Sequence, residues 1–305
     1  MGIKFHFLNV GDGDCTIVDF PKRKVTSTGQ SKDARTMMVD IHHHAEVNDN
    51  NYESVIDYYK DNFLGRPIFR FIATHPHKDH LKGIKALFND NSIQILNFWD
   101  LEHEFKPKEE GEDWEDYKDD WEKYCEVRQM KDSQLCVRRY WDHNKNIKYW
   151  DEDRIEILSP SRDLHYGAHH KEDGSKKEHH EIDLNNMPYV LLVKVNNRKI
   201  LLASDAENAC WDYILENHDG KIRDIDIFKA AHHGHESGLH EEVLKVMNPK
   251  FVVFSNSSER DGEYGVQERY EEIIPGVIVY KTCDLGTIIA DVPFEESEDI
   301  SFQKT

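Results

Sequence analysis

The sequence lacks paired cysteines, long apolar runs and clusters of basic residues. Its five cysteines are scattered and none forms a CxxC pair, so we expect reduced thiols rather than a disulfide framework. No apolar run approaches the roughly 18–20 residues of a membrane-spanning helix. The N-terminus alternates like a strand, without the apolar segment of a signal peptide. These absences predict a soluble cytoplasmic protein with no membrane partner.

Positive charge is scarce, because 39 Lys and Arg residues stand against 59 Asp and Glu residues, a net charge of −20. Proteins that hold duplex DNA through its phosphates carry a basic face. The best basic cluster here is the short PKRK at residues 21–24. A long duplex is therefore a poor substrate, whereas a smaller phosphate-containing substrate is compatible, since bound cations can reverse the local field.

The 305 residues predict one large domain, residues 1–305, in which strands and helices alternate. An opening hairpin is predicted around the GDGD turn at residues 11–14, and strands at residues 36–41 and 68–74. The last third reads as strands separated by helices. This order favours an α/β (α+β) domain of two sheets flanked by helices.

Two segments depart from that pattern. Residues 101–150 are charged and aromatic, and Trp114, Tyr117, Trp121 and Tyr124 fall on one face of a predicted helix. This helical insert either packs on the main domain or caps the active site with its aromatic side chains. Residues 161–185 form a polar, His-rich segment that we interpret as a long loop at the edge of the site, with a second metal site as the alternative.

The stretch ATHPHKDHLKG, at residues 73–83, holds the strongest functional signal. His75, His77, Asp79 and His80 lie within six positions, and imidazole and carboxylate are preferred ligands of Zn²⁺ and related ions. In an extended chain His75 and His77 can reach one ion, and the Asp–His pair beyond can reach a second. The alternative is a polar loop without metal.

Further ligand candidates lie where later strands end. Asp205 follows the strand KILLAS, and His232 and His233 follow the strand IDIFKA. Each is weak alone, because a strand-end Asp is usually a cap. Together with the first cluster they form a set.

The HxHxDH motif, with the later Asp and His, resembles the metallo-β-lactamase superfamily. FLNVGDGDCTIVDF, LLASDAE, KAAHHGH and YKTCDLGTI further resemble the competence-protein (ComEC/Rec2-like) branch. The resemblance spans nearly the whole chain except the insert and the His-rich segment. It implies an αββα sandwich of two mixed sheets, with the metals at one edge.

The resemblance also implies a dinuclear centre of two divalent ions, Zn²⁺ or Mn²⁺, with a bridging hydroxide as nucleophile. Its ligands would be His75, His77, Asp79, His80, Asp205 and His232. Asp79 and Asp205 would serve catalysis, and Asp40 would orient a ligand histidine. His233 would contact substrate or protonate the leaving group, or else exchange roles with His232.

The motifs depart from the family pattern at several positions. Asn185 or Asn186 stands where many members have a histidine of the first site, so either amide is a possible ligand. Ser204 replaces a glycine before the bridging Asp. His235 is new near the site, and we predict substrate contacts from Tyr264 and Ser237.

These features predict a metal-dependent hydrolase, foremost a phosphodiesterase or nuclease acting on single strands, nucleic-acid ends or nucleotides. One alternative is a hydrolase of a small ester, lactone or non-nucleic phosphodiester. Another is a metal-bearing regulatory subunit that binds a protein partner through residues 101–150.

Overall fold

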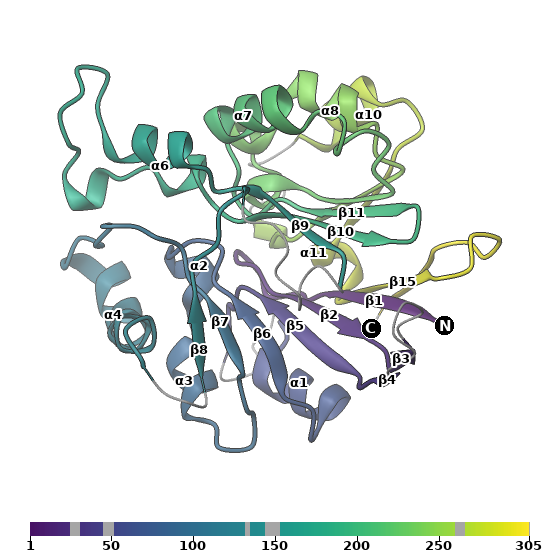
Figure 1. The fold of residues 1–305 in the computed structure, drawn as a ribbon, viewed down its shortest axis with the longest axis horizontal. Helices are drawn as coiled ribbons and strands as arrows, with labels where there is room; N and C mark the ends of the chain where they lie inside the picture. The colour runs from purple at the N-terminus through teal and green to yellow at the C-terminus, as the bar shows by residue number, and fades with distance from the viewer. Residues whose placement is uncertain (25–30, 45–51, 132–134, 144–152, 260–265, 305) are drawn as a thin grey trace.

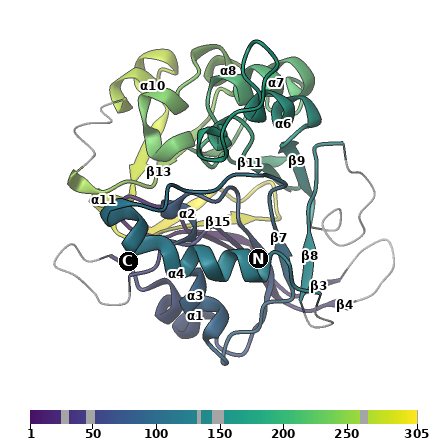
Figure 2. The same cartoon turned by 90° about the vertical axis from the view of Figure 1, so that its left-hand side faces the viewer.

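The computed structural model describes residues 1–24, 31–44, 52–131, 135–143, 153–259 and 266–304. Two mixed β-sheets face one another, with helices on both outer faces (Figures 1 and 2). This confirms the predicted αββα sandwich. In the described residues, no helix is long and apolar enough to cross a membrane.

The first sheet has the order β16-β15-β1-β2-β5-β6-β7-β8. Its strands are β1 Gly2–Phe7, β2 Thr16–Phe20, β5 Arg35–Val39, β6 Ile68–Ile72, β7 Asn97–Trp99, β8 Cys136–Arg138, β15 Ile288–Pro293 and β16 Ser301–Lys304. β1 and β2 pair antiparallel around the GDGD turn, as predicted, whereas β5 to β8 run parallel. β3 Arg23–Lys24 and β4 Ser31–Lys32 pair antiparallel in a separate two-stranded sheet.

The second sheet has the order β14-β13-β12-β11-β10-β9. Its strands are β9 Ile155–Ser159, β10 Val190–Val195, β11 Arg198–Leu202, β12 Ile227–Lys229, β13 Phe251–Phe254 and β14 Ile278–Lys281. β11 to β14 are parallel, so their carboxyl ends meet at one edge. That edge positions the residues after β11 and β12 together.

Helices cover both outer faces. Near the first sheet lie α1 Val55–Phe63, α2 Lys78–Leu81, α3 Ile84–Asn89 and α4 Gly111–Val127. On the second sheet lie α6 Arg162–His169, α7 Asn208–His218, α8 Glu241–Met247 and α10 Gln267–Ile273, while the short α11 Thr282–Leu285 follows β14. One apolar core fills the space between the sheets, and a second lies under α1, α3 and α4.

In their described residues, the two unusual segments contain more regular structure than the sequence suggested. The insert contains helix α4, as predicted, and also the edge strand β8. The prediction of one continuous loop over residues 161–185 was wrong, because α6 begins at Arg162, where the Ser161 hydroxyl accepts a hydrogen bond from Leu164 N. Two 3-10 turns follow, η1 His179–Glu181 and η2 Leu184–Asn186.

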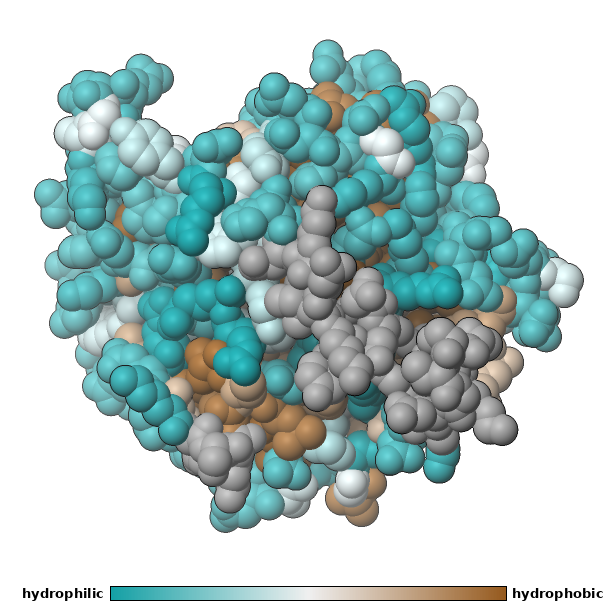
Figure 3. All heavy atoms as spheres, viewed as in Figure 1, coloured by the Kyte–Doolittle hydropathy of each residue, from teal (hydrophilic) through white to brown (hydrophobic). Residues whose placement is uncertain are grey.

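Hydrophilic side chains dominate the face shown in Figure 3. This agrees with a chain in which 32% of residues are charged. Hydrophobic residues on this face show mainly as a patch below its centre (Figure 3).

Candidate metal centre

Asp205 lies at the centre of the predicted cluster, in the turn after β11. Its Oδ2 atom is 3.8 Å from His75 Nε2 and 3.7 Å from His232 Nε2. Its Oδ1 atom is 3.1 Å from His80 Nε2 and 3.7 Å from His233 Nε2. The two carboxylate oxygens therefore each face two imidazoles.

The loop after β6 supplies the remaining ligand candidates. His77 Nδ1 lies 3.0 Å from His75 Nε2, on the side of Asp205 Oδ2. Asp79 Oδ2 lies 3.1 Å from His233 Nε2 and 3.6 Å from His80 Nε2. Ligands of a tetrahedral zinc ion are separated by about 3.4 Å, so these spacings suit two neighbouring cations.

This arrangement revises the roles expected for the last two histidines. His233 rather than His232 joins Asp79 and His80, whereas His232 lies on the side of His75. Both residues adopt left-handed backbone conformations, with φ of 48° and 57°, which are unfavourable for side-chain-bearing residues. This backbone directs two consecutive imidazoles to opposite oxygens of Asp205.

Each of the four imidazoles is held through its other nitrogen. His75 Nδ1 contacts the Thr74 and Ser204 hydroxyls at 3.2 and 3.3 Å. The partners of the remaining Nδ1 atoms are Asp40 at 2.8 Å for His80, Glu207 at 3.0 Å for His232, and the Ser255 carbonyl at 3.1 Å for His233. Ligand histidines typically have such partners, and Asp40 makes the contact expected of it.

Unpartnered polar atoms provide a test of whether a cation fits. His80 Nε2 and Asp205 Oδ1 are both buried and lie 3.1 Å apart. Neither atom has a hydrogen-bond partner, because the angles between the two groups do not suit a hydrogen bond. Asp14 Oδ1 is also buried without a partner, and Asp14 groups with His80, Asp205 and His233 within 4.8 Å. Such groups are costly in a folded protein unless something else satisfies them. The donor set therefore fits a divalent cation.

The charges of the cluster favour the same occupant. Burial lowers the pKa of His75 well below its ordinary value, leaving a neutral ring. Burial also lowers the pKa of His80, but the carboxylates around it, Asp205 first, outweigh burial and raise this pKa well above its ordinary value. Burial raises the pKa of Asp205, yet His80 and His233 more than reverse this. A cation would replace the proton that His80 otherwise holds among these carboxylates.

The two amides predicted as possible ligands, Asn185 and Asn186, have different hydrogen-bond partners. Asn186 Oδ1 accepts hydrogen bonds from Ala209 N and Cys210 N, at 2.8 and 3.3 Å, and so caps helix α7. Asn185 Nδ2 donates to Glu207 Oε1 at 3.4 Å, while its Oδ1 is buried without a partner. Asn185 therefore remains a candidate ligand, and Asn186 has a structural role.

Two other residues predicted near the site, Ser237 and His235, are not among the side chains that face Asp205. Ser237 lies behind His232, where its hydroxyl donates to Glu207 Oε1 at 2.8 Å. His235 Nδ1 accepts from Ser237 N at 3.1 Å and caps the turn η4 Glu236–Gly238. Tyr264 lies outside the described residues, so its expected substrate contact stays a prediction.

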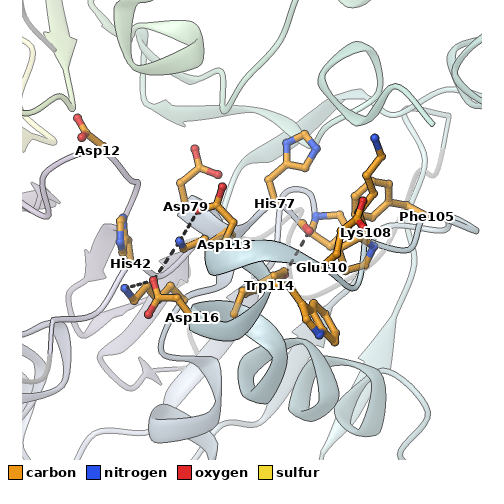
Figure 4. A pocket seen from close by; sticks show the side chains of 15 residues that line it. Asp12, His42, His77, Asp79, Phe105, Lys108, Glu110, Asp113, Trp114 and Asp116 are labelled. Atoms are coloured by element: carbon orange, nitrogen blue, oxygen red, sulfur yellow. Dashed lines mark hydrogen bonds and ion pairs between the residues drawn. The ribbon is translucent and has the colours of Figure 1, made fainter. Parts of the chain in front are cut away.

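A pocket of about 790 Å³ opens beside His77 and Asp79 (Figure 4). Residues 105–117 of the insert form one wall, including the half-buried rings of Phe105 and Trp114. In Figure 4, Asp79 lies between His42 on one side and His77 on the other. The insert thus shapes the space in which a substrate would meet the cluster.

Helix α4 is also tied directly to the cluster. Its Tyr117, Trp121 and Tyr124 are buried, so the aromatic stripe packs on the main domain, and Trp114 faces the pocket. The Tyr117 hydroxyl donates to the carbonyl of Pro76, between His75 and His77, at 3.2 Å.

Sequence reasoning missed several residues of the centre. Asp14 belongs to the GDGD turn and forms a buried ion pair with Lys229 at 2.9 Å. Glu207 stands in the SDAE motif, two residues after Asp205. Ser204, noted above only as a replacement for glycine, has φ of 50° and donates to Thr74 Oγ1 at 2.6 Å. The sequence shows these residue types, but it does not show that they lie close to the cluster.

No family model and no curated protein sequence matches this chain. Among solved structures, Igni18, described as a novel metallo hydrolase from the hyperthermophilic archaeon Ignicoccus hospitalis KIN4/I, aligns over 96% of this chain and 100% of its own. The identity is 14% and the TM-score 0.52. This likeness shows a shared fold, in agreement with the metallo-β-lactamase sandwich predicted from the motifs.

Two more structures align less closely. A mutant of CmlA beta-hydroxylase matches 92% of this chain and 52% of its own, at 11% identity and a TM-score of 0.47. A long form RNase Z from yeast matches 85% of this chain and 37% of its own, at 12% identity and a TM-score of 0.40. The narrower resemblance to the competence-protein branch stays a prediction.

Proposed function

We propose that this protein is a metal-dependent hydrolase that uses two divalent ions to cleave a phosphodiester in a nucleotide or a short single strand. The observation that supports it best is the position of Asp205, whose two oxygens are each faced by two Nε2 atoms. A carboxylate placed between two sets of imidazoles suits a bridging ligand.

The proposed ligands divide into two sets. The first ion would be held by His75, His77, His232 and Asp205, with Asn185 beside it, and the second by Asp79, His80, His233 and Asp205. Zn²⁺ is the leading candidate and Mn²⁺ the alternative. Two such ions supply a water nucleophile near neutral pH and offset charge on both the attacking and the leaving oxygen.

The protein groups have separate tasks in this proposal. Asp205 joins the two halves, and Asp40 and Glu207 keep their histidines oriented. The Asp79 side chain is 34% exposed and lines the pocket, so it can accept a hydrogen bond from an attacking water and orient it. The buried Lys229–Asp14 pair holds the GDGD turn against this group, since Asp14 N also donates to Asp79 O at 3.1 Å.

The pocket supports a small substrate over a long polyanion. Lys78 and Lys82 line it, but Asp113 and Asp116 of α4 pair with them at 2.7–3.0 Å. Their charge is therefore largely cancelled and offers little to a phosphate backbone. The ring of Trp114 offers a surface on which a base can stack.

Metal content and a substrate panel test the proposal. Elemental analysis should find two divalent ions per chain, and the panel comprises bis-p-nitrophenyl phosphate, single-stranded DNA, RNA, cyclic nucleotides and lactones. Asp79→Ala and Asp205→Ala should abolish phosphodiester hydrolysis while circular dichroism stays native. Asp212→Ala, at an exposed carboxylate outside the cluster, is the matched control. Full activity in both cluster variants would overturn the proposal.

The same panel separates the other candidates. The apolar residues Phe105, Pro107 and Trp114 in the pocket also suit a small ester or lactone, which would then be the substrate that turns over. A regulatory subunit would show no turnover with Zn²⁺ or Mn²⁺ and would retain a protein partner through residues 101–150.

A further inference from the structure

His42 is a polar side chain that the proposed centre does not use, although it lines the same pocket as His77 and Asp79. Its Nδ1 atom is buried without a hydrogen-bond partner. None of the described residues forms a hydrogen bond with this ring. A buried imidazole nitrogen without a partner costs stability, and here it belongs to a ring that lines the pocket.

The backbone fixes His42 against the ligand loop. Ile41 N donates to His80 O at 3.0 Å, and His43 N donates to Lys82 O at 2.8 Å. His42 lies between these two attachments, so its side chain is positioned by the same helix, α2, that carries His80. The backbone on both sides of this ring is therefore attached to the segment that carries His80.

The surroundings are also shaped for this ring. It stacks on His44 with centroids 4.9 Å apart and planes 28° apart, and His44 is itself bonded through Nε2 to Val10 O. A Cβ atom on Gly13 would lie 1.7 Å from His42 Nδ1, so the GDGD turn can approach only because glycine stands there. With Nδ1 enclosed, Nε2 is the nitrogen left to meet a ligand.

We infer that His42 binds the substrate directly, donating a hydrogen bond from Nε2 to an oxygen of its anionic ester group. This deepens the proposed function, on which it rests, by adding a contact on the side of Asp79 away from His77. Burial lowers the pKa of His42 to about 3, so the ring is neutral near pH 7 and keeps one N–H to donate. It therefore adds a directed contact without adding charge.

The matched control is the next histidine along the chain. His43 is also half-buried, and its Nδ1 is likewise buried without a partner, but it packs against Gly83 and is not among the residues that line the pocket. His43→Leu therefore reproduces the loss of an imidazole from this segment without touching substrate.

The first experiment measures binding of inorganic phosphate to the metal-loaded protein by calorimetry. His42→Leu should weaken phosphate binding about tenfold or more, as expected for a hydrogen bond to a charged group. His42→Gln, which keeps a donor, should recover part of the affinity, and His43→Leu should bind within about twofold of the wild-type protein. Equal affinity in wild type and His42→Leu, or no phosphate binding by the wild type, would overturn the inference.

Kinetics with bis-p-nitrophenyl phosphate distinguish this inference from the proposed function. If the wild type hydrolyses the diester and His42→Leu does so with unchanged kcat/KM, the His42 contact is wrong and the hydrolase stands. If no diester is hydrolysed but His42→Leu still loses phosphate affinity, the contact stands and the phosphodiesterase proposal fails. Metal content and circular dichroism show whether each variant is folded, and His42→Gln provides the readout if His42→Leu is not.

Discussion

At the scale of single residues, His232 shows how the proposed centre can be complete with an amide, Asn185 or Asn186, where the resemblance implies a histidine. Its Nε2 atom lies 3.7 Å from Asp205 Oδ2, and its Nδ1 atom lies 3.0 Å from Glu207 and 2.8 Å from the Ser237 hydroxyl. A carboxylate on the far nitrogen orients the ring and raises its basicity. His232 is therefore equipped to act as the third imidazole of the first site.

Removing His232 should cost one of the two metal ions. We expect His232→Ala to bind about one ion per chain, and Glu207→Gln to keep two but with an affinity about 10–100-fold lower at one site, as is typical for outer partners of metal ligands. Elemental analysis and Zn²⁺ titration measure both. His143→Ala is the control, because His143 is an exposed histidine that pairs with Asp142 outside the cluster; two tightly held ions in His232→Ala would contradict the assignment.

At the scale of secondary structure, α4 has two faces with different tasks. Its buried aromatic residues fix it to the main domain, so the helix is an integral part of the fold rather than a movable lid. Its acidic face pairs with lysines of α2 and α3, including Lys85 with Asp119 at 2.6 Å. Exposed ion pairs contribute at most about 1 kcal/mol each to stability. We therefore infer that the main effect of this acidic face is to cancel the positive charge of the lysines at the pocket.

Removing the carboxylates that pair with the pocket lysines should increase the affinity of the protein for polyanions. The double variant Asp113→Asn/Asp116→Asn frees Lys78 and Lys82, and we expect it to bind a labelled single-stranded oligonucleotide several-fold more tightly at low salt. Salt should remove the difference, because screening shortens the range of exposed charges. Fluorescence anisotropy at two salt concentrations measures this. Asp119→Asn, farther along α4, should have little effect, and an unchanged double variant would show that α4 does not control charge here.

At the scale of the whole molecule, the two sheets are joined by a buried ionic contact as well as by the apolar core. Asp153, just before β9, accepts from Arg70 of β6 at 3.0 Å and also from Arg35 of β5. Arg70 is 2% exposed and Asp153 1%. The contact links the first sheet to the start of the second, and its loss would leave the Arg70 charge inside the protein without this carboxylate.

Breaking this contact should destabilise the fold more than any surface pair does. We expect Asp153→Ala to lower the free energy of unfolding by about 3–5 kcal/mol, the usual cost of removing one partner from a buried ion pair. Urea denaturation with metal in excess measures it. Glu241→Ala, which removes an exposed pair with Lys245, should change it by less than about 0.5 kcal/mol; similar losses in both would refute a special role for Asp153.

The sequence by itself determined the chemistry available and much of the architecture. His75, His77, Asp79 and His80 are neighbours in the chain, so their spacing alone indicated a metal cluster, and the strand and helix patterns predicted the sandwich. Local periodicity carries that information because burial on one face imposes it.

Only the tertiary structure decided which residues meet. The opposite directions of His232 and His233, and the approach of Asp14 and His42 to the ligand loop, depend on strand ends from two sheets converging at one edge. The same packing gave Asn185 and Asn186 different partners. It also left Trp114 at the pocket, while the other aromatic residues of α4 are buried. Such proximity arises from backbone conformation and long-range packing, and no spacing along the chain encodes it.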